Sequence, residues 1–382
     1  MSLMRIAIVA GEHSGDQLGF KLMRALRAAE PGVEFVGVGG DAMEAEGLES
    51  FFALSDIAVM GILPVLARLP TILARIRQAA DTIIAAKPDG LVIIDSPDFS
   101  HRVARRVRKA LPKLPIIDYV SPSVWAWRPG RAKTMRAYVD CVLALLPFEP
   151  AAHLRLGGPR CVYVGHPLIE RLDELRPNAE EVRRREASPP LVAVLPGSRR
   201  AEISRLMADF GAALGLLSRT HGPFELVLPT LPHVRAEVEA RAAEWPVKPR
   251  IVMGELEKYA VFRGARAALA ASGTVTLELA LAGVPLVGAY KVSLLEEQLK
   301  YLIKVHSILP PNLILDAREV PELLQRDCTP ETLAVALGPL IEEGPTRAAQ
   351  KAALARLDAL MRLPDGRAPS DHAAGIVLET LR

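Results

Sequence analysis

The chain lacks several features that would point directly to a function. Its 382 residues include only three cysteines, and these show neither the paired spacing of a zinc site nor a disulfide framework. The eight histidines are scattered without metal-ligand spacing, so we expect no metal site. A formal net charge of +3 is too small for a general nucleic-acid binder, so we expect no nucleic-acid partner.

Long apolar segments and the common nucleotide-binding signatures are also missing. No apolar run reaches the roughly 20 residues of a transmembrane helix, and the chain does not start with a basic segment followed by a secretory core. The loop Gly11–Asp16 does not match the three-glycine dinucleotide fingerprint, and Pro196–Arg200 lacks the Lys-Ser/Thr ending of a P-loop. We therefore expect a soluble protein of a reducing compartment in which these loops bind ligands without forming a dinucleotide fingerprint or a P-loop.

Short apolar runs alternate with helical stretches along the whole chain, which is too long for a single ordinary core. Runs such as Arg5–Ala10 and Leu91–Ile94 are continuously apolar, which is typical of strands buried on both faces of a parallel sheet. The pattern resets in the charged stretch Glu174–Pro190, where we expect Arg183, Arg184 and Arg185 to form a solvated face.

The sequence therefore predicts an α/β protein of two Rossmann-like, doubly wound domains. The expected parts are an N-terminal domain over residues 1–168, a C-terminal domain over 169–345 and a helical tail over 346–382 that can return to the N-terminal domain.

A tryptophan loop, Ser121–Trp127, holds two of the three tryptophans. It follows the predicted strand Leu114–Val120, and in α/β proteins ligands bind where the carboxyl end of a strand meets its loop. Two indoles among serines and a proline make a shaped, amphipathic surface. We expect Ser121, Trp125 and Trp127 to contact substrate; the alternative is that both indoles fill a domain interface.

The loop Gly11–Asp16 follows the first predicted strand. Its glycines permit a tight turn, and the helix after it offers free N–H groups to a sugar or an anion. We expect Glu12, Ser14 and Asp16 to bind sugar, while helix capping by Ser14 or Asp16 is the alternative.

Two carboxylates, Asp95 and Asp98, follow the strand Leu91–Ile94, where the chain is bent by Pro97. A carboxylate in such a position can serve as a general base. We assign the chemistry to Asp98 and a structural role to Asp95, such as capping a helix that starts near Ser100.

Two loops in the second half suit a nucleotide. Pro196–Arg200 offers a glycine turn, a hydroxyl and an arginine at a helix N-terminus, which together suit a diphosphate. In Ala271–Thr274 small residues let a phosphate approach, and Glu278 one turn later can accept ribose hydroxyls; a capping motif with a solvated Glu278 is the alternative. The candidate nucleotide-binding residues are Gly197, Ser198, Arg199, Ser272, Gly273, Thr274 and Glu278.

Leu63–Ala86 is the most apolar helix candidate. One face carries Leu66, Leu69, Leu73 and Ile76, with Arg68, Arg75 and Arg77 nearby. Such a helix can lie in a membrane interface and attract anionic lipid, although most amphipathic helices face a protein core. Both interpretations stay open at this stage.

The order of these loops resembles the lipid-A-disaccharide synthase family. The segments that carry the resemblance are Ala10–Asp16, Asp95–Phe99, Ser121–Trp127, Leu195–Arg199, Ala271–Thr274 and Leu309–Ile314, the last of which is similar to the family's Pro-Asn-Leu segment. The likeness runs from Met4 to about Gln325, and the tryptophan loop is its most specific element.

The resemblance implies the glycosyltransferase B architecture, in which two Rossmann-like domains face each other across a cleft. It implies a hexosyltransferase that joins UDP-2,3-diacylglucosamine to 2,3-diacylglucosamine 1-phosphate with inversion, giving lipid A disaccharide 1-phosphate and UDP. It also implies that no metal or other cofactor takes part. The expected location is cytoplasmic, in peripheral contact with lipid at the inner face of the inner membrane of Gram-negative bacteria.

The resemblance also implies roles for single residues. Asp98 becomes the base that deprotonates the acceptor's 6-hydroxyl. Arg199 and the amides near Ser272–Thr274 stabilise the departing diphosphate, Glu278 holds the ribose, and Asn312 belongs to the UDP site.

On the acceptor side, the resemblance implies that Glu12, Ser14 and Asp16 face the reacting sugars. The tryptophan loop and the segment Leu63–Ala86 become candidates for contact with the acyl chains. Two other functions stay open: an isomerase of the same architecture that resembles UDP-N-acetylglucosamine 2-epimerase, and a non-catalytic nucleotide-sugar sensor.

Overall fold

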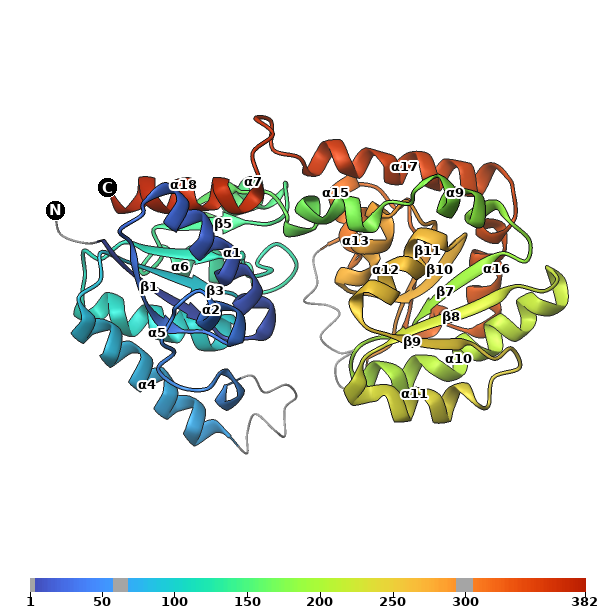
Figure 1. Ribbon diagram of the computed structural model, residues 1–382, viewed down its shortest axis with the longest axis horizontal. Helices are drawn as coiled ribbons and strands as arrows, with labels where there is room; N and C mark the ends of the chain where they lie inside the picture. Colours follow the sequence, from blue (N-terminus) through green and yellow to red (C-terminus); the bar gives the residue numbers. More distant parts are fainter. Residues whose placement is uncertain (1–3, 58–67, 293–304) are drawn as a thin grey trace. The chain divides into compact units, whose positions relative to one another are not determined.

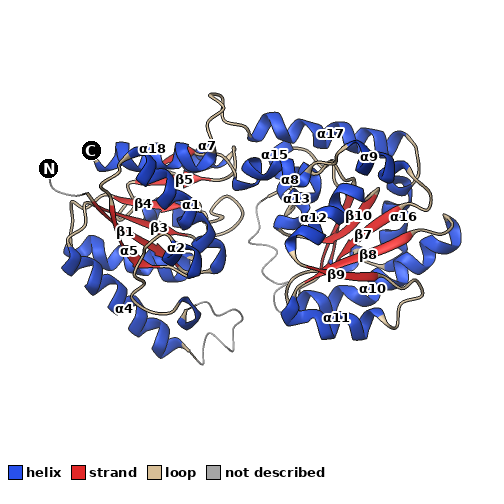
Figure 2. Cartoon of the chain, in the orientation of Figure 1, coloured by secondary structure: helices blue, strands red, loops and turns tan. Residues whose placement is uncertain are grey.

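A computed structural model gives the fold and describes residues 4–57, 68–292 and 305–382. These residues form two six-stranded sheets whose strand pairs are all parallel, and helices flank each sheet (Figures 1 and 2). The chain divides into two compact units: residues 1–169 with 361–382, and residues 170–360. The predicted class, two Rossmann-like domains, is confirmed.

The first unit is built on a sheet with the strand order β2-β1-β3-β4-β5-β6. Its strands are β1 Arg5–Ala10, β2 Glu34–Val38, β3 Gly90–Ile94, β4 Ile116–Tyr119, β5 Cys141–Ala144 and β6 Arg160–Tyr163. Its helices are α1 His13–Ala29, α2 Asp41–Ala45, α4 Leu69–Ala86, α5 Pro97–Ala110, α6 Gly130–Met135, α7 Glu149–Arg155 and α18 Pro369–Leu381, with short 3₁₀ turns η1 Leu54–Asp56 and η2 Pro167–Arg171.

Side chains alternate along the strands of this sheet and so form one core on each face. Ile6 and Ile8 of β1 pack with α1 and α18, whereas Ala7 and Val9 pack with α4 and α5. A Cβ built on Gly90 would lie 2.0 Å from Leu381, so α18 sits directly against β3. The end of the chain therefore completes the core of the first unit.

The second unit has a sheet with the strand order β12-β11-β10-β7-β8-β9. Its strands are β7 Leu191–Leu195, β8 Glu225–Thr230, β9 Arg250–Met253, β10 Ala267–Ala271, β11 Leu286–Tyr290 and β12 Glu322–Leu324. Its helices are α8 Leu172–Leu175, α9 Ala179–Glu186, α10 Arg200–Thr220, α11 Arg235–Ala242, α12 Glu255–Gly264, α13 Thr274–Leu281, α15 Pro310–Leu315, α16 Pro330–Ile341 and α17 Pro345–Met361, with short turns η3 Pro232–Val234 and η5 Gln325–Asp327.

Arg185 is a buried exception in the arginine run, so the expectation of a solvated face was wrong for this residue. Its guanidinium donates to four carbonyl oxygens: Phe262 and Arg263 at the end of α12, and Ala282 and Gly283 at the end of α13. The last carbonyls of a helix lack intrahelical partners, and a cation suits that end of the helix dipole. Arg185 therefore fixes the ends of two helices at once.

Two helices begin earlier than the sequence predicted, and this changes where site residues lie. α1 begins at His13 and α5 at Pro97, so Ser14 and Asp98 lie in first helical turns. Proline suits the first turn because the amide it lacks has no intrahelical partner there. The predicted segment Leu63–Ala86 is described only from Arg68 onward, so Leu66 lies outside the described residues. The sequence also predicts a helix over Leu294–Ile303, and this segment lies outside the described residues as well.

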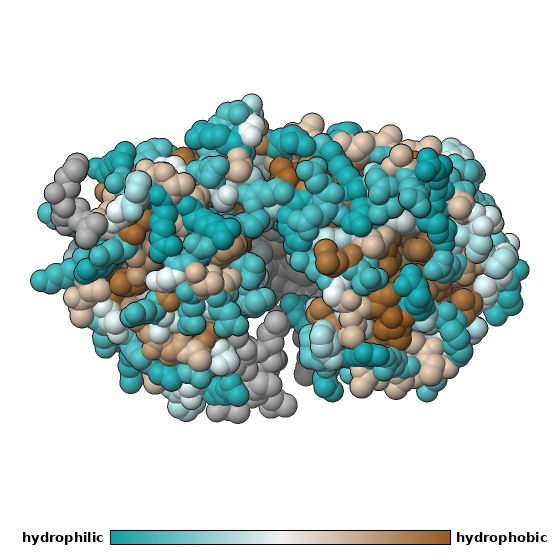
Figure 3. Space-filling model, in the orientation of Figure 1, coloured by the Kyte–Doolittle hydropathy of each residue, from teal (hydrophilic) through white to brown (hydrophobic). Residues whose placement is uncertain are grey.

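Most of the surface visible in Figure 3 is hydrophilic, with apolar side chains gathered over α12 and the neighbouring strands of the second unit. Leu231 and Leu256 are among the large apolar side chains that are exposed. Across the described residues, no helix combines the length and apolar character needed to span a membrane.

Candidate functional site

In the first unit, the loops that follow β1 and β3 lie against each other. A Cβ built on Gly11 would lie 2.3 Å from the Cβ of Ser96, so only glycine allows this approach. Ser14 Oγ donates to Asp95 Oδ2 over 3.2 Å. The structure thus brings two of the predicted loops together at the carboxyl edge of this sheet, where α/β proteins bind ligands.

Asp16 is completely buried and organises a neighbouring loop. Its Oδ1 accepts the amides of Gly40 and Met43 over 2.8 and 3.1 Å, and its Oδ2 accepts that of Ala42 over 3.1 Å. These amides open α2, so the carboxylate satisfies donors that a helix leaves free. Contact between Asp16 and a sugar would have to compete with them and stays a prediction, whereas Glu12 is half-buried and Ser14 is exposed.

Asp98 projects from the first turn of α5, and its side chain is 88% exposed. Its Oδ1 lies 3.7 Å from Nη2 of Arg131, which comes from α6. Such a carboxylate is accessible to a hydroxyl group, as a general base has to be.

The turn between β3 and α5 is strained. Asp95 and Ser96 adopt left-handed φ angles of 51° and 47°, which non-glycine residues rarely do. Asp95 Oδ1 accepts the amide of Ser96 over 2.7 Å, and the main-chain oxygen of Asp95 accepts Ser100 Oγ over 2.6 Å. Asp95 is thus structural, but the predicted cap was wrong: Ser96 is the N-cap residue, and among the described contacts no side chain caps α5.

The tryptophan loop is anchored by α7. Ser121 Oγ is 2.8 Å from His153 Nε2, and Trp125 Nε1 donates to Glu149 Oε1 over 3.0 Å. Trp127 is 39% exposed, with the Arg128 guanidinium 4.2 Å from its ring centroid. Neither Glu149 nor His153 was among the candidate residues predicted from the sequence, although both follow the carboxyl end of β5.

In the second unit, Glu202 satisfies the amides of the loop before α10. Its Oε2 accepts the amides of Ser198 and Arg199 over 3.0 and 3.3 Å, and its Oε1 pairs with Arg199 Nη1 at 2.9 Å. Gly197 has a φ of 122°, and a Cβ there would meet Glu202 Oε2 at 2.4 Å. A diphosphate would therefore compete with Glu202 for these amides, while the outer part of Arg199 is open to solvent.

The start of α13 is a more open anion site. Gly273 is the N-cap residue, with a φ of 154°, and a Cβ built on it would meet no atom of the described residues within 4 Å. Thr274 is exposed, and the described first turn of this helix contains no acidic side chain. Free amides and the helix dipole at such an end favour a negatively charged group.

Glu278, one turn into α13, is held by two residues of α12. Lys258 Nζ lies 3.0 Å from both carboxylate oxygens, and Tyr259 Oη donates to Oε1 over 3.3 Å. Burial, followed by the charge of Glu278, raises the pKa of Tyr259, so its hydroxyl stays a donor. The carboxylate of Glu278 is therefore bound by other side chains and is not merely solvated. Lys258 could not be predicted from the sequence, because a lone lysine on a helix is common.

Asn312 is buried and braces the chain before β12. Its Nδ2 donates to the carbonyl of Val320 over 2.9 Å, and its Oδ1 accepts the Val320 amide over 2.9 Å. Ser307 Oγ is 3.3 Å from the same Nδ2. Both ends of the amide are thus used internally, and its predicted contact with UDP stays a prediction.

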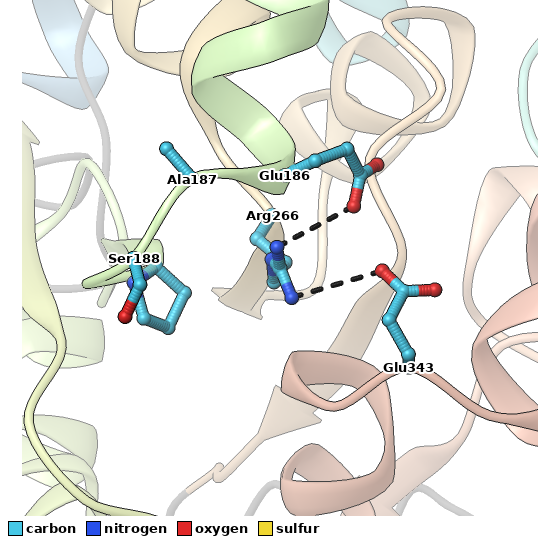
Figure 4. A pocket seen from close by; sticks show the side chains of 6 residues that line it. Glu186, Ala187, Ser188, Arg266 and Glu343 are labelled. Carbon is cyan, nitrogen blue, oxygen red and sulfur yellow. Dashed lines mark ion pairs between the residues drawn. The ribbon is translucent and has the colours of Figure 1, made fainter.

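A cavity of about 580 Å³ opens at the other end of the second sheet (Figure 4). Arg266, just before β10, crosses it to pair with Glu186 at 3.4 Å and Glu343 at 3.7 Å. Its lining residue Pro190 immediately precedes β7, so the cavity lies at the amino ends of the strands. It is therefore remote from the loops expected to bind ligand. Elsewhere in the described residues, no group of three metal-binding side chains gathers.

Comparison with known proteins identifies the family. The model of the family described as lipid-A-disaccharide synthetase matches residues 6–372. The chain belongs to the lipid-A-disaccharide synthase family. The lipid-A-disaccharide synthase of Nitrobacter hamburgensis is 55% identical over 100% of this chain and 96% of its own length. That of Bradyrhizobium diazoefficiens is 55% identical over 99% of this chain and 97% of its own length.

Solved structures with low sequence identity share the fold of this synthase family member. UDP-GlcNAc 2-epimerase from Neisseria meningitidis, solved with bound UDP-GlcNAc, superposes with a TM-score of 0.62 at 13% identity, over 99% of each chain. MurG from Acinetobacter baumannii gives a TM-score of 0.59 at 14% identity, over 98% of this chain and 99% of its own. At these identities the likeness shows the glycosyltransferase B fold alone, so the epimerase alternative has support only from the fold.

Proposed function

We propose that the chain transfers a diacylglucosaminyl group from UDP-2,3-diacylglucosamine to 2,3-diacylglucosamine 1-phosphate, giving lipid A disaccharide 1-phosphate and UDP. The observation that carries this proposal is the 55% identity to synthases of this name along the whole chain. Two sheets that present polar loops at the carboxyl ends of their strands agree with it. The epimerase alternative lacks comparable support.

The proposed reaction is a single displacement with inversion. Asp98 takes the proton from the acceptor's 6-hydroxyl as that oxygen attacks the anomeric carbon of the donor. The bond from that carbon to the UDP oxygen breaks, and UDP departs with the bonding electrons. The amides at Gly273 and Thr274 and the guanidinium of Arg199 receive the charge that develops on the diphosphate. Because the displacement inverts the anomeric carbon, the acceptor oxygen must approach that carbon from the side opposite the departing diphosphate.

The remaining predicted residues hold the substrates. Glu278, held by Lys258, accepts the ribose hydroxyls of UDP. Glu12 and Ser14 at the carboxyl edge of the first sheet bind the reacting sugars. Asp16 and Asn312 also hold the loops around the two sites, so the predicted contacts of Asp16 with sugar and of Asn312 with UDP would share atoms that the chain itself engages.

Apolar side chains near these loops offer places for the acyl chains. In the first unit Leu69 and Leu73 of α4 are 40% and 36% exposed, whereas Ile76 is buried in the core. In the second unit Leu231 and Leu256 follow the neighbouring strands β8 and β9. We propose that α4, which carries Arg77 and is preceded by Arg68, contacts lipid peripherally at the inner face of the inner membrane.

Mass spectrometry of the products tests the proposed function. The purified chain, mixed with UDP-diacylglucosamine and the acylated sugar phosphate, should give the disaccharide 1-phosphate and one UDP for each disaccharide. The matched control omits the acceptor, and it should give no disaccharide. Interconversion of UDP-N-acetylglucosamine and its 2-epimer without acceptor, together with no disaccharide in the full mixture, would favour the epimerase instead.

A further inference from the structure

Two buried side chains of α7 bind the two ends of the tryptophan loop. Glu149 and His153 are four residues apart and therefore lie on one face of this helix. Glu149 Oε1 accepts Trp125 Nε1 over 3.0 Å near the end of the loop, and His153 Nε2 is 2.8 Å from Ser121 Oγ at its start. One helix face thus fixes both the position and the span of the loop.

The Glu149 carboxylate also binds the chain that leads into α7. Its Oε2 accepts the amides of Leu145 and Leu146 over 3.1 and 3.0 Å. Phe148 meets the Trp125 ring edge-on, with the ring centroids 5.1 Å apart and an interplanar angle of 86°. An indole has a single N–H donor, so a bond to a fixed carboxylate together with this ring contact selects one orientation of the ring.

Burial of this carboxylate is costly. Glu149 is only 3% exposed, and burial raises its pKa to about 7 against the effect of the three N–H donors. Burying an ionisable group of this kind destabilises the folded state unless hydrogen bonds offset the lost hydration. All of its hydrogen bonds go to the β5–α7 turn and to Trp125. The carboxylate therefore stabilises the conformation of the tryptophan loop.

The hydrogen-bond pattern also assigns the tautomer of His153. Ser121 Oγ lies 3.1 Å from the carbonyl of Pro122, to which it donates, so His153 Nε2–H donates to Ser121. His153 Nδ1 is then a bare acceptor, in agreement with its having no partner among the described residues. Burial lowers the pKa of His153, which keeps the ring neutral in this role.

We propose that Glu149 is a positioning residue for acceptor binding, because it holds the indole of Trp125 in the orientation that the acceptor meets, with His153 securing the start of the same loop. This inference rests on the proposed function, since it takes the tryptophan loop to be part of the acceptor site. Glu149 itself is buried beneath the loop and acts through Trp125.

The test is Glu149→Gln in the full chain. The glutamine oxygen keeps the two backbone amides, so the side-chain NH₂ faces the indole N–H and their hydrogen bond is lost. In NMR spectra, the indole N–H resonance of Trp125 is assigned by its loss in Trp125→Phe. We expect this resonance to move upfield in Glu149→Gln, while the resonance of Trp245 does not shift. We expect the KM for the acceptor to rise about tenfold, the scale of one bond to a charged group, with kcat and the KM for the UDP-sugar unchanged.

Glu34→Gln is the matched control, because it removes an exposed carboxylate of the same unit that pairs with Arg5 at the amino end of the sheet. Glu34→Gln should change neither the indole resonance of Trp125 nor the KM for the acceptor. In a Trp125→Phe background, Glu149→Gln should add little to the acceptor KM, since the two changes remove one contact. Trp125→Phe alone tests that contact even where Glu149→Gln does not fold.

An unmoved Trp125 resonance in Glu149→Gln, or an unchanged acceptor KM in both Glu149→Gln and Trp125→Phe, would overturn the positioning role. The resonance is measured without substrate, so it separates this inference from the proposed function. A wild-type chain that makes no disaccharide refutes the proposed function, whereas an active chain with an unmoved resonance refutes the positioning role alone.

Discussion

Replacing Glu278 by glutamine tests the donor site at the atoms that would bind ribose. In the structure both carboxylate oxygens are engaged by Lys258 Nζ at 3.0 Å, and each oxygen retains lone pairs for a further donor. In Glu278→Gln the amide oxygen goes to the ammonium, because an NH₂ group cannot accept from it. The NH₂ group of the glutamine then lies where the second carboxylate oxygen would accept a ribose hydroxyl, and an NH₂ group cannot accept that hydrogen bond.

The size of the effect follows from these contacts. A hydrogen bond to a charged group contributes about 1.5–3 kcal/mol, and the low end applies here because Lys258 already draws on the same carboxylate. A loss of about 1.4 kcal/mol is a tenfold change in affinity. We therefore expect the wild-type chain to bind UDP about tenfold more tightly than 2′-deoxy-UDP, and Glu278→Gln to lose most of that preference.

Calorimetric titration of both nucleotides into both proteins measures this preference directly. Glu257→Gln, an exposed carboxylate on α12, is the control and should behave as the wild type does. Because both nucleotides are measured on the same protein, any partial unfolding of a variant lowers both affinities equally and cancels from their ratio. A Glu278→Gln protein that still prefers UDP over 2′-deoxy-UDP by the wild-type factor would remove Glu278 from the ribose site.

Two further predictions concern stability and the membrane. Arg185→Met should lower the free energy of unfolding by about 3–5 kcal/mol in denaturant titration, because it removes the shared donor of four carbonyls. A loss below about 1 kcal/mol, the scale of an exposed ion pair, would contradict that role. Replacing Leu69 and Leu73 together by glutamate should weaken co-sedimentation with anionic vesicles at unchanged thermal stability; equal binding would show that α4 does not contact lipid.

Much of the fold was accessible from the sequence because the strands are continuous apolar runs. β1 and β3, for example, are almost entirely buried and were predicted within a residue of their observed bounds. The rule that ligands meet the carboxyl ends of parallel strands then selected the loops. Helix starts were less predictable: Pro97 opens α5 itself, which moved Asp98 from a loop into a helical turn.

Two of the residues missed from the sequence act through contacts that are distant in the chain. Glu149 reaches Trp125 from 24 positions away, and Lys258 reaches Glu278 from 20. No local sequence pattern predicts such pairs. Glu202, by contrast, lies only three residues from Arg199. It could have been predicted, because a carboxylate at this position of a helix commonly binds the amides before it.

The most direct test of the central claim is the single-turnover rate of Asp98→Asn, measured alongside its affinity for UDP. Asp81→Asn is the matched control, since Asp81 is also an exposed carboxylate of the first unit paired with an arginine, Arg106. If Asp98 is the base, its amide variant should lose about 10²–10⁴-fold in rate while UDP binding and the control rate stay unchanged. An Asp98→Asn protein that forms the disaccharide at the wild-type rate would contradict the account.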